Sequence, residues 1–160
     1  MLVSDLPIEL WGLEKLVQGT GPEIELAGTA VNCGDAARII YETPVNVIVV
    51  DLDGEIGIDA IAELCSLSPA RVLVLTASRD VSVHDGAILA GARGVLTKGE
   101  PVAALLTAII KIDEGEFWID GAATGRIFFH LAQRRMAEYE TPDQLRIASL
   151  TRRERQTIAE

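Results

Sequence analysis

The sequence predicts an α/β protein built on a doubly wound, five-stranded parallel sheet with helices on both faces. Two patterns support this prediction. Short apolar, β-branched runs alternate along the chain with segments of helical spacing. The runs at 45–50 and 72–75 are almost entirely apolar, which is typical of parallel strands buried on both faces. An additional amphipathic helix is expected after the last strand–helix pair.

The first half of the chain predicts three strands. A first strand over 1–3 precedes a helix that begins near Pro7, because proline is tolerated in the first turn of a helix. A second strand is expected over 24–29, and Asp35 is expected to cap the helix after it. The central strand over 45–50 ends in two aspartates and a glycine.

The second half continues the same alternation. A helix is expected through 58–64, a strand over 71–76 and a helix over 82–90. The fifth strand, 95–98, ends in a lysine, and Pro101 opens the helix that follows it.

From Gly121 onward the periodicity changes. One stripe of an extra helix is formed by Phe128, Ala132, Met136 and Tyr139. This stripe is expected either to cover the core or to form a dimer surface. The predicted organisation is a first domain over 1–116, a linker helix region over 117–146, and the start of a further domain, cut short, over 147–160.

Composition limits the classes of function. The 160 residues carry a formal net charge of −10, which argues against this segment itself binding a phosphate backbone. The sequence contains neither a run near the ~20 apolar residues of a membrane span nor a secretory signal. We therefore expect a cytoplasmic protein with no membrane contact.

Four predicted strands end in polar residues: Asp5, Asp51, Thr76 and Lys98. In the flavodoxin-like strand order 2-1-3-4-5 these residues meet at one crevice. The carboxylates can hold Mg²⁺, and Asp51 can act as a nucleophile toward a phosphoryl group. Lys98 and Thr76 can then contact the phosphoryl oxygens. Crowding of Asp5, Asp51 and Asp53 is expected to raise the pKa of one of them.

These residues resemble the receiver domain of two-component response regulators. The resemblance rests on Leu2-Val3-Ser4-Asp5, Val49-Val50-Asp51-Leu52, Leu75-Thr76-Ala77 and the segment 91–98. The tail Leu150-Thr151-Arg152-Arg153-Glu154-Arg155 looks like the opening of a LuxR/NarL-type helix-turn-helix domain.

The resemblance implies a transcriptional signalling protein and not an enzyme. Asp51 would be the phosphoacceptor, served by a histidine kinase or another phosphodonor, and Thr76 and Lys98 would contact the phosphoryl group. Mg²⁺ would be held by Asp5, Asp51 and Asp53, the last through its backbone carbonyl. A homodimer would bind DNA only through a C-terminal domain, with no DNA contact from residues 1–160.

The chain also departs from the receiver pattern. Ser4 replaces one of two acidic residues, which should weaken Mg²⁺ binding, and Val95 stands where the family has its switch aromatic. These departures leave open an atypical pseudo-receiver that acts without phosphorylation, by binding a protein or a ligand. The run from Val47 to Gly54 also looks like the first motif of haloacid-dehalogenase-type phosphatases, which leaves a remote enzymatic alternative.

Overall fold

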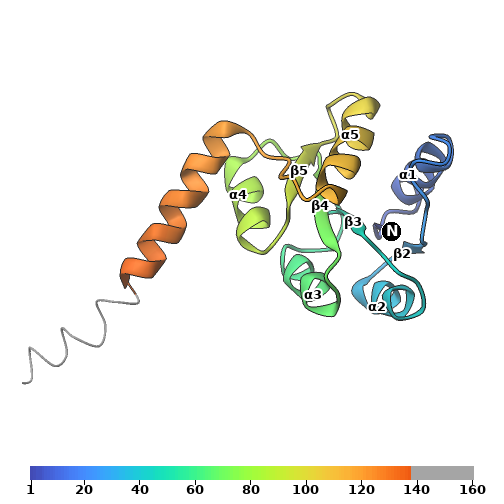
Figure 1. Ribbon diagram of the computed structural model, residues 1–160, viewed down its shortest axis with the longest axis horizontal. Helices are drawn as coiled ribbons and strands as arrows, with labels where there is room; N and C mark the ends of the chain where they lie inside the picture. Colours follow the sequence, from blue (N-terminus) through green and yellow to red (C-terminus); the bar gives the residue numbers. More distant parts are fainter. Residues whose placement is uncertain (138–160) are drawn as a thin grey trace, which may run out of the picture. The chain divides into compact units, whose positions relative to one another are not determined.

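A five-stranded parallel sheet in the order β2-β1-β3-β4-β5 lies at the centre of this computed structural model, which describes residues 1–137 (Figure 1). The strands are β1 Leu2–Val3, β2 Thr29–Ala30, β3 Val47–Asp51, β4 Arg71–Thr76 and β5 Gly94–Thr97. Every neighbouring pair is parallel. The predicted fold class and the flavodoxin-like strand order are thus confirmed.

Helices cover both faces of the sheet. They are α1 Pro7–Gln18, α2 Cys33–Glu42, α3 Asp59–Leu67, α4 Val81–Leu89 and α5 Val102–Asp113. Side chains alternate along β4: Val72 and Val74 join a core cluster that includes residues of α2, α3 and α4, whereas Leu73 and Leu75 join one that includes residues of α1 and α5. The central strands are therefore buried on both faces, as their apolar sequence indicates.

Two predicted local features are wrong. The second strand does not cover 24–29 but only Thr29–Ala30, because its partner β1 is itself two residues long and offers no further ladder. Ile24 and Leu26 still pack against the core, from a segment outside the strand. The cap of α2 is Asn32, whose side-chain oxygen accepts a hydrogen bond from the Asp35 backbone N–H at 2.8 Å. Asp35 instead lies in the first helical turn, where a negative charge favours the helix dipole.

The chain returns to β5 after α5. Gly94 forms a parallel bridge with Trp118, and the Val95 N–H donates to the Trp118 carbonyl oxygen at 3.1 Å. A Cβ atom on Gly94 would lie 2.6 Å from the Trp118 Cβ and 2.9 Å from its carbonyl oxygen. Glycine is therefore needed where the two backbones approach this closely.

The chain divides into two compact units, residues 1–123 and the residues from 124 onward. Residues 121–137 are helical, which agrees with the extra helix expected in this region. Tyr139 and the segment 147–160 lie outside the described residues, so the domain boundaries at 116 and 146 stay predictions. Within residues 1–137, no helix has the length and apolar character needed to cross a membrane.

Candidate functional site

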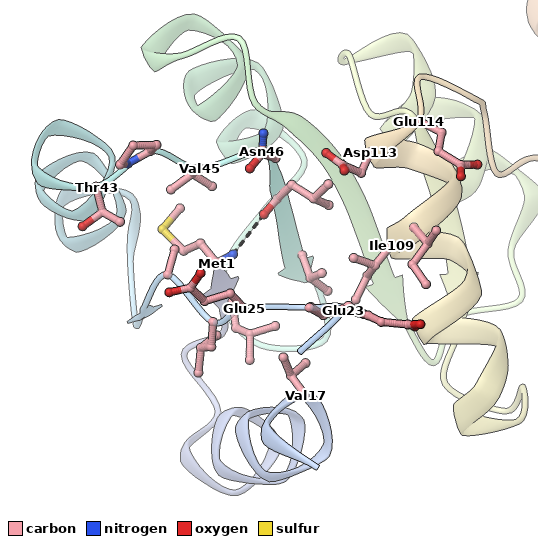
Figure 2. Close-up of a pocket in the computed structure, with 18 residues that line it drawn as sticks. Met1, Val17, Glu23, Glu25, Thr43, Val45, Asn46, Ile109, Asp113 and Glu114 are labelled. Carbon is pink, nitrogen blue, oxygen red and sulfur yellow. Dashed lines mark hydrogen bonds between the residues drawn. The ribbon is translucent and has the colours of Figure 1, made fainter. Parts of the chain in front are cut away.

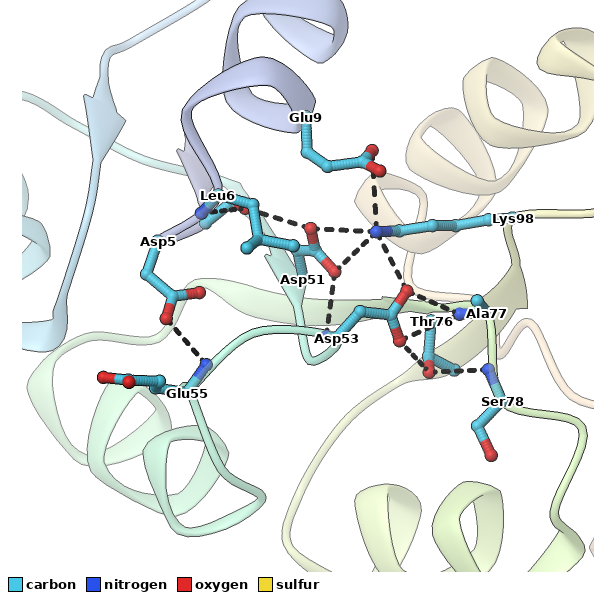
Figure 3. Close-up of polar contacts among 11 residues, drawn as sticks. Asp5, Leu6, Glu9, Asp51, Asp53, Glu55, Thr76, Ala77, Ser78 and Lys98 are labelled. Carbon is cyan, nitrogen blue, oxygen red and sulfur yellow. Dashed lines mark hydrogen bonds and ion pairs between the residues drawn. The ribbon is translucent and has the colours of Figure 1, made fainter.

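Asp51 is the last residue of β3 and its side chain is completely buried. Its Oδ2 accepts a hydrogen bond from the Ser4 hydroxyl at 2.9 Å, and its Oδ1 accepts one from the Asp53 backbone N–H at 3.1 Å. The Lys98 ammonium lies 2.9 Å from Oδ1 and 3.0 Å from Oδ2 (Figure 3). Both oxygens are thus satisfied, as a buried carboxylate requires.

Lys98 follows β5 and connects three carboxylates. Besides Asp51, its Nζ contacts Asp53 Oδ2 at 2.9 Å and Glu9 Oε2 at 3.5 Å. Burial lowers the pKa of Lys98, but the hydrogen bonds and charges of Asp51 and Asp53 outweigh this effect and raise it. Lys98 therefore supplies a fixed positive charge at the carboxyl ends of the central strands.

The Asp53 side chain turns toward β4. Its Oδ1 accepts a hydrogen bond from the Thr76 hydroxyl at 2.7 Å, and the Ala77 N–H lies 2.9 Å from Oδ1 and 2.7 Å from Oδ2. Partial burial raises the pKa of Asp53, but hydrogen bonds from Thr76, Lys98 and Ala77 and the Lys98 charge together lower it. Crowding of the carboxylates therefore does not raise the pKa of Asp53, because the hydrogen bonds from Thr76, Lys98 and Ala77 and the Lys98 charge outweigh it.

Asp5 lies in the loop between β1 and α1. Its Oδ2 accepts a hydrogen bond from the Glu55 N–H at 2.7 Å, whereas its buried Oδ1 has no hydrogen-bond partner. Gly54 lies against this carboxylate so closely that a Cβ atom there would collide with it. Asp5 is thus held by the loop that follows β3.

The structure places only some of the predicted residues in direct contact with one another. Asp51 and Lys98 are in direct contact, whereas Thr76 reaches them through the Asp53 carboxylate. Sequence reasoning did not anticipate the contacts made by Ser4, by Glu9 and by the Ala77 backbone. Only Ser4 could have been found from its place at a strand end. Val95, at the switch position, is partly buried and packs against the core.

A hard cation such as Mg²⁺ takes oxygen ligands, and an oxygen without a hydrogen-bond partner suits one. Asp5 Oδ1 is such an atom on the same edge of the sheet as Asp51. Within residues 1–137, however, no three His, Cys, Asp or Glu side chains are grouped as a metal site. The predicted Mg²⁺ ligands, the Asp5 and Asp51 carboxylates and the Asp53 carbonyl oxygen, therefore stay a prediction, and Asp5 Oδ1 is the atom among them that the structure leaves without a hydrogen-bond partner.

A separate pocket of about 860 Å³ lies at the amino ends of β1 and β3, at the other end of the strands from Asp51 (Figure 2). Its lining includes Glu23, Glu25, Asp113 and Glu114. These carboxylates would repel an anionic ligand such as a phosphate, and ligands of open α/β sheets bind beyond the carboxyl ends of the strands. The cluster around Asp51 is therefore the better candidate.

Known proteins similar to this chain are regulators of transcription. No family model matches it. The transcriptional regulatory protein LiaR of Bacillus subtilis is 30% identical over 157 residues, which cover 96% of this chain and 71% of LiaR. DevR/DosR of Mycobacterium tuberculosis, a DNA-binding transcriptional activator, is 30% identical over 96% of this chain and 69% of its own length.

Solved structures agree with these relatives. A LuxR-family two-component response regulator from Aurantimonas matches with a TM-score of 0.68 and 30% identity, over 85% of this chain and 96% of that one. The receiver domain of RcsB from Salmonella enterica matches with a TM-score of 0.64 at 18% identity, over 79% of this chain and 94% of that one, which shows the shared fold. From its relatives and its fold, the chain belongs to the LuxR/NarL family of two-component response regulators.

Proposed function

We propose that residues 1–116 form a receiver domain whose Asp51 accepts a phosphoryl group. The observation that supports this is the buried Asp51 carboxylate in contact with Lys98, at the carboxyl ends of β3 and β5. The Thr76 hydroxyl donates a hydrogen bond to the Asp53 carboxylate beside this pair. An acid, a fixed ammonium and a hydroxyl at one sheet edge suit phosphoryl transfer, in which positioning and charge stabilisation dominate.

In the proposed step, an Asp51 carboxylate oxygen attacks the phosphorus atom of a kinase phosphohistidine. A P–O bond forms, the P–N bond breaks, and the electron pair of that bond leaves with the imidazole. Lys98 balances the negative charge on the transferred oxygens, and Thr76 donates a hydrogen bond to one of them. Mg²⁺ held by Asp5, Asp51 and the Asp53 carbonyl would supply further positive charge to the same oxygens.

The proposed output is control of transcription by a cytoplasmic homodimer. DNA would be bound by a C-terminal domain of the LuxR/NarL type and not by residues 1–137. The apolar stripe of the extra helix, which includes Phe128 and Met136, would contribute to the surface of this dimer.

Mass spectrometry of the intact protein tests the phosphoacceptor. With Mg²⁺ and acetyl phosphate, wild type should gain the mass of one phosphoryl group, and Asp51→Asn should not. Glu55→Ala, which removes a neighbouring exposed carboxylate, should react like wild type. No adduct on wild type would favour the pseudo-receiver, and continuous hydrolysis of a phosphate monoester that is lost in Asp51→Asn would favour the phosphatase.

A further inference from the structure

Lys98 and Thr76, the donors assigned above to a phosphoryl group, already bind an anion together with the Ala77 N–H. The Thr76 hydroxyl, the Ala77 N–H and the Lys98 ammonium all lie 2.7 to 2.9 Å from oxygens of the Asp53 carboxylate. Figure 3 shows this carboxylate between Thr76, Ala77 and Lys98. The three donors come from β4, the residue after it and the residue after β5, so the sheet itself places them around one anion.

Asp53 is also fixed relative to Asp51. Its backbone N–H donates to Asp51 Oδ1, and Lys98 contacts both side chains. The Asp53 carboxylate therefore lies next to the nucleophile, on the side where Lys98 and Thr76 would receive transferred oxygens. Two anions cannot use the same three donors, because each additional like charge raises the energy of the cluster.

We propose that the Asp53 carboxylate is an internal ligand of the phosphoryl-oxygen site and must leave it before Asp51 can be phosphorylated. This inference rests on the proposed function and adds a competing group to it. Displacement exchanges charge-assisted hydrogen bonds for water, and such bonds are the stronger kind in proteins. Asp53 would thus make the receiver slow to react with small phosphodonors.

The chain offers a matched pair of variants. Asp53→Ala removes the competing carboxylate. Glu55→Ala removes the same charge from the same loop, and Figure 3 shows the Glu55 side chain pointing away from the donors. Both variants keep the backbone N–H groups that bind Asp51 and Asp5.

The first measurement is the rate of phosphoryl adduct formation from acetyl phosphate at saturating Mg²⁺. The acetate leaves as the P–O bond to Asp51 forms. Asp53→Ala should react roughly tenfold faster than wild type, the factor that corresponds to about 1.4 kcal/mol. Glu55→Ala should change the rate less than twofold, a small general charge effect.

The second measurement follows the Ala77 amide by NMR and needs no turnover. Asp53→Ala should shift this resonance strongly in the free protein, because its carboxylate acceptor is lost, and Glu55→Ala should not. Adding beryllofluoride should then move the Ala77 resonance more in Asp53→Ala than in wild type. An adduct that forms at equal or lower rate in Asp53→Ala overturns the inference and leaves the proposed function intact. No adduct on Asp51 in any variant means that the proposed function itself has failed.

Discussion

Ser4 replaces an acid that receiver domains usually have, yet it has a structural role in the site. Its buried hydroxyl donates to Asp51 Oδ2 and accepts a hydrogen bond from the Leu6 N–H at 3.2 Å. The substitution therefore exchanges a negative charge for a neutral donor. With a serine at this position, Lys98 has fewer carboxylates to balance, so more of its positive charge offsets the charge of Asp51.

Removing the Ser4 hydroxyl should destabilise the fold. Ser4→Ala leaves the Leu6 N–H and one Asp51 oxygen without this partner, so the free energy of unfolding should fall by about 1–2 kcal/mol. Urea denaturation measures the change. Ser66→Ala, which removes an exposed hydroxyl bound to the Glu63 carbonyl, should cost less. Equal effects of the two variants would contradict a special role for Ser4.

Restoring the acid should couple stability to the cation. Ser4→Asp places another carboxylate beside the buried Asp51, so the melting temperature in EDTA should fall below that of wild type. Mg²⁺ should raise the melting temperature of Ser4→Asp more than that of wild type, because binding to the native state alone stabilises it. An identical Mg²⁺ response in both proteins would count against a cation at this edge.

Much of the site could be predicted from sequence, because residues at the carboxyl ends of parallel strands must meet once the strand order is known. Asp51, Thr76 and Lys98 follow this rule. The direction of the Asp53 side chain does not, because it depends on loop backbone geometry and on the Ala77 N–H, which has no signature in the sequence. Glu9 was missed for a similar reason, since a surface glutamate on a helix has many partners open to it.

At the scale of elements, the long apolar strands could be predicted from the sequence, whereas the extent of the short strand β2 could not. β3 and β4 carry their own signal of continuous burial. The extent of β2 depends on how many residues β1 offers, which no local pattern contains. Asn32 and Asp35 can both cap a helix, and the outcome depended on where the preceding backbone leaves the strand.

The α2 cap gives a test at this scale. Asn32→Ala removes the oxygen that accepts the Asp35 N–H, so the free energy of unfolding should fall by about 1 kcal/mol. Asn32→Ser keeps a capping oxygen and should stay close to wild type. Thermal melts followed by circular dichroism compare them, and a stable Asn32→Ala would assign the cap elsewhere.

The contact between β5 and Trp118 gives a second test. Gly94→Ala introduces a Cβ atom that overlaps the Trp118 backbone and side chain, and should cost about 1–3 kcal/mol. Gly57→Ala places its Cβ in open space and should cost little. Trp118 fluorescence should report the rearrangement in Gly94→Ala only. Unchanged fluorescence and stability would show that the two segments separate easily.

At the scale of the whole molecule, the proposed dimer can be tested on the chain itself. Replacing both Phe128 and Met136 by serine should shift the protein toward monomer in sedimentation velocity, because both side chains are large, apolar and exposed. Tyr41→Ser alters an exposed aromatic residue on α2 and should leave the distribution unchanged. A monomeric wild type, or an unaffected dimer, would contradict this surface.

The backbone pairing at Trp118 also bears on how this protein avoids aggregation. An open parallel sheet has two edge strands, whose unpaired amide and carbonyl groups can pair with a strand from another molecule. In this sheet, the edge strand β5 is partly covered by the bridge between Gly94 and Trp118, and the other edge strand, β2, has only two residues. Neither edge strand therefore offers a long row of unpaired backbone groups, and pairing with another molecule would first have to disrupt native hydrogen bonds.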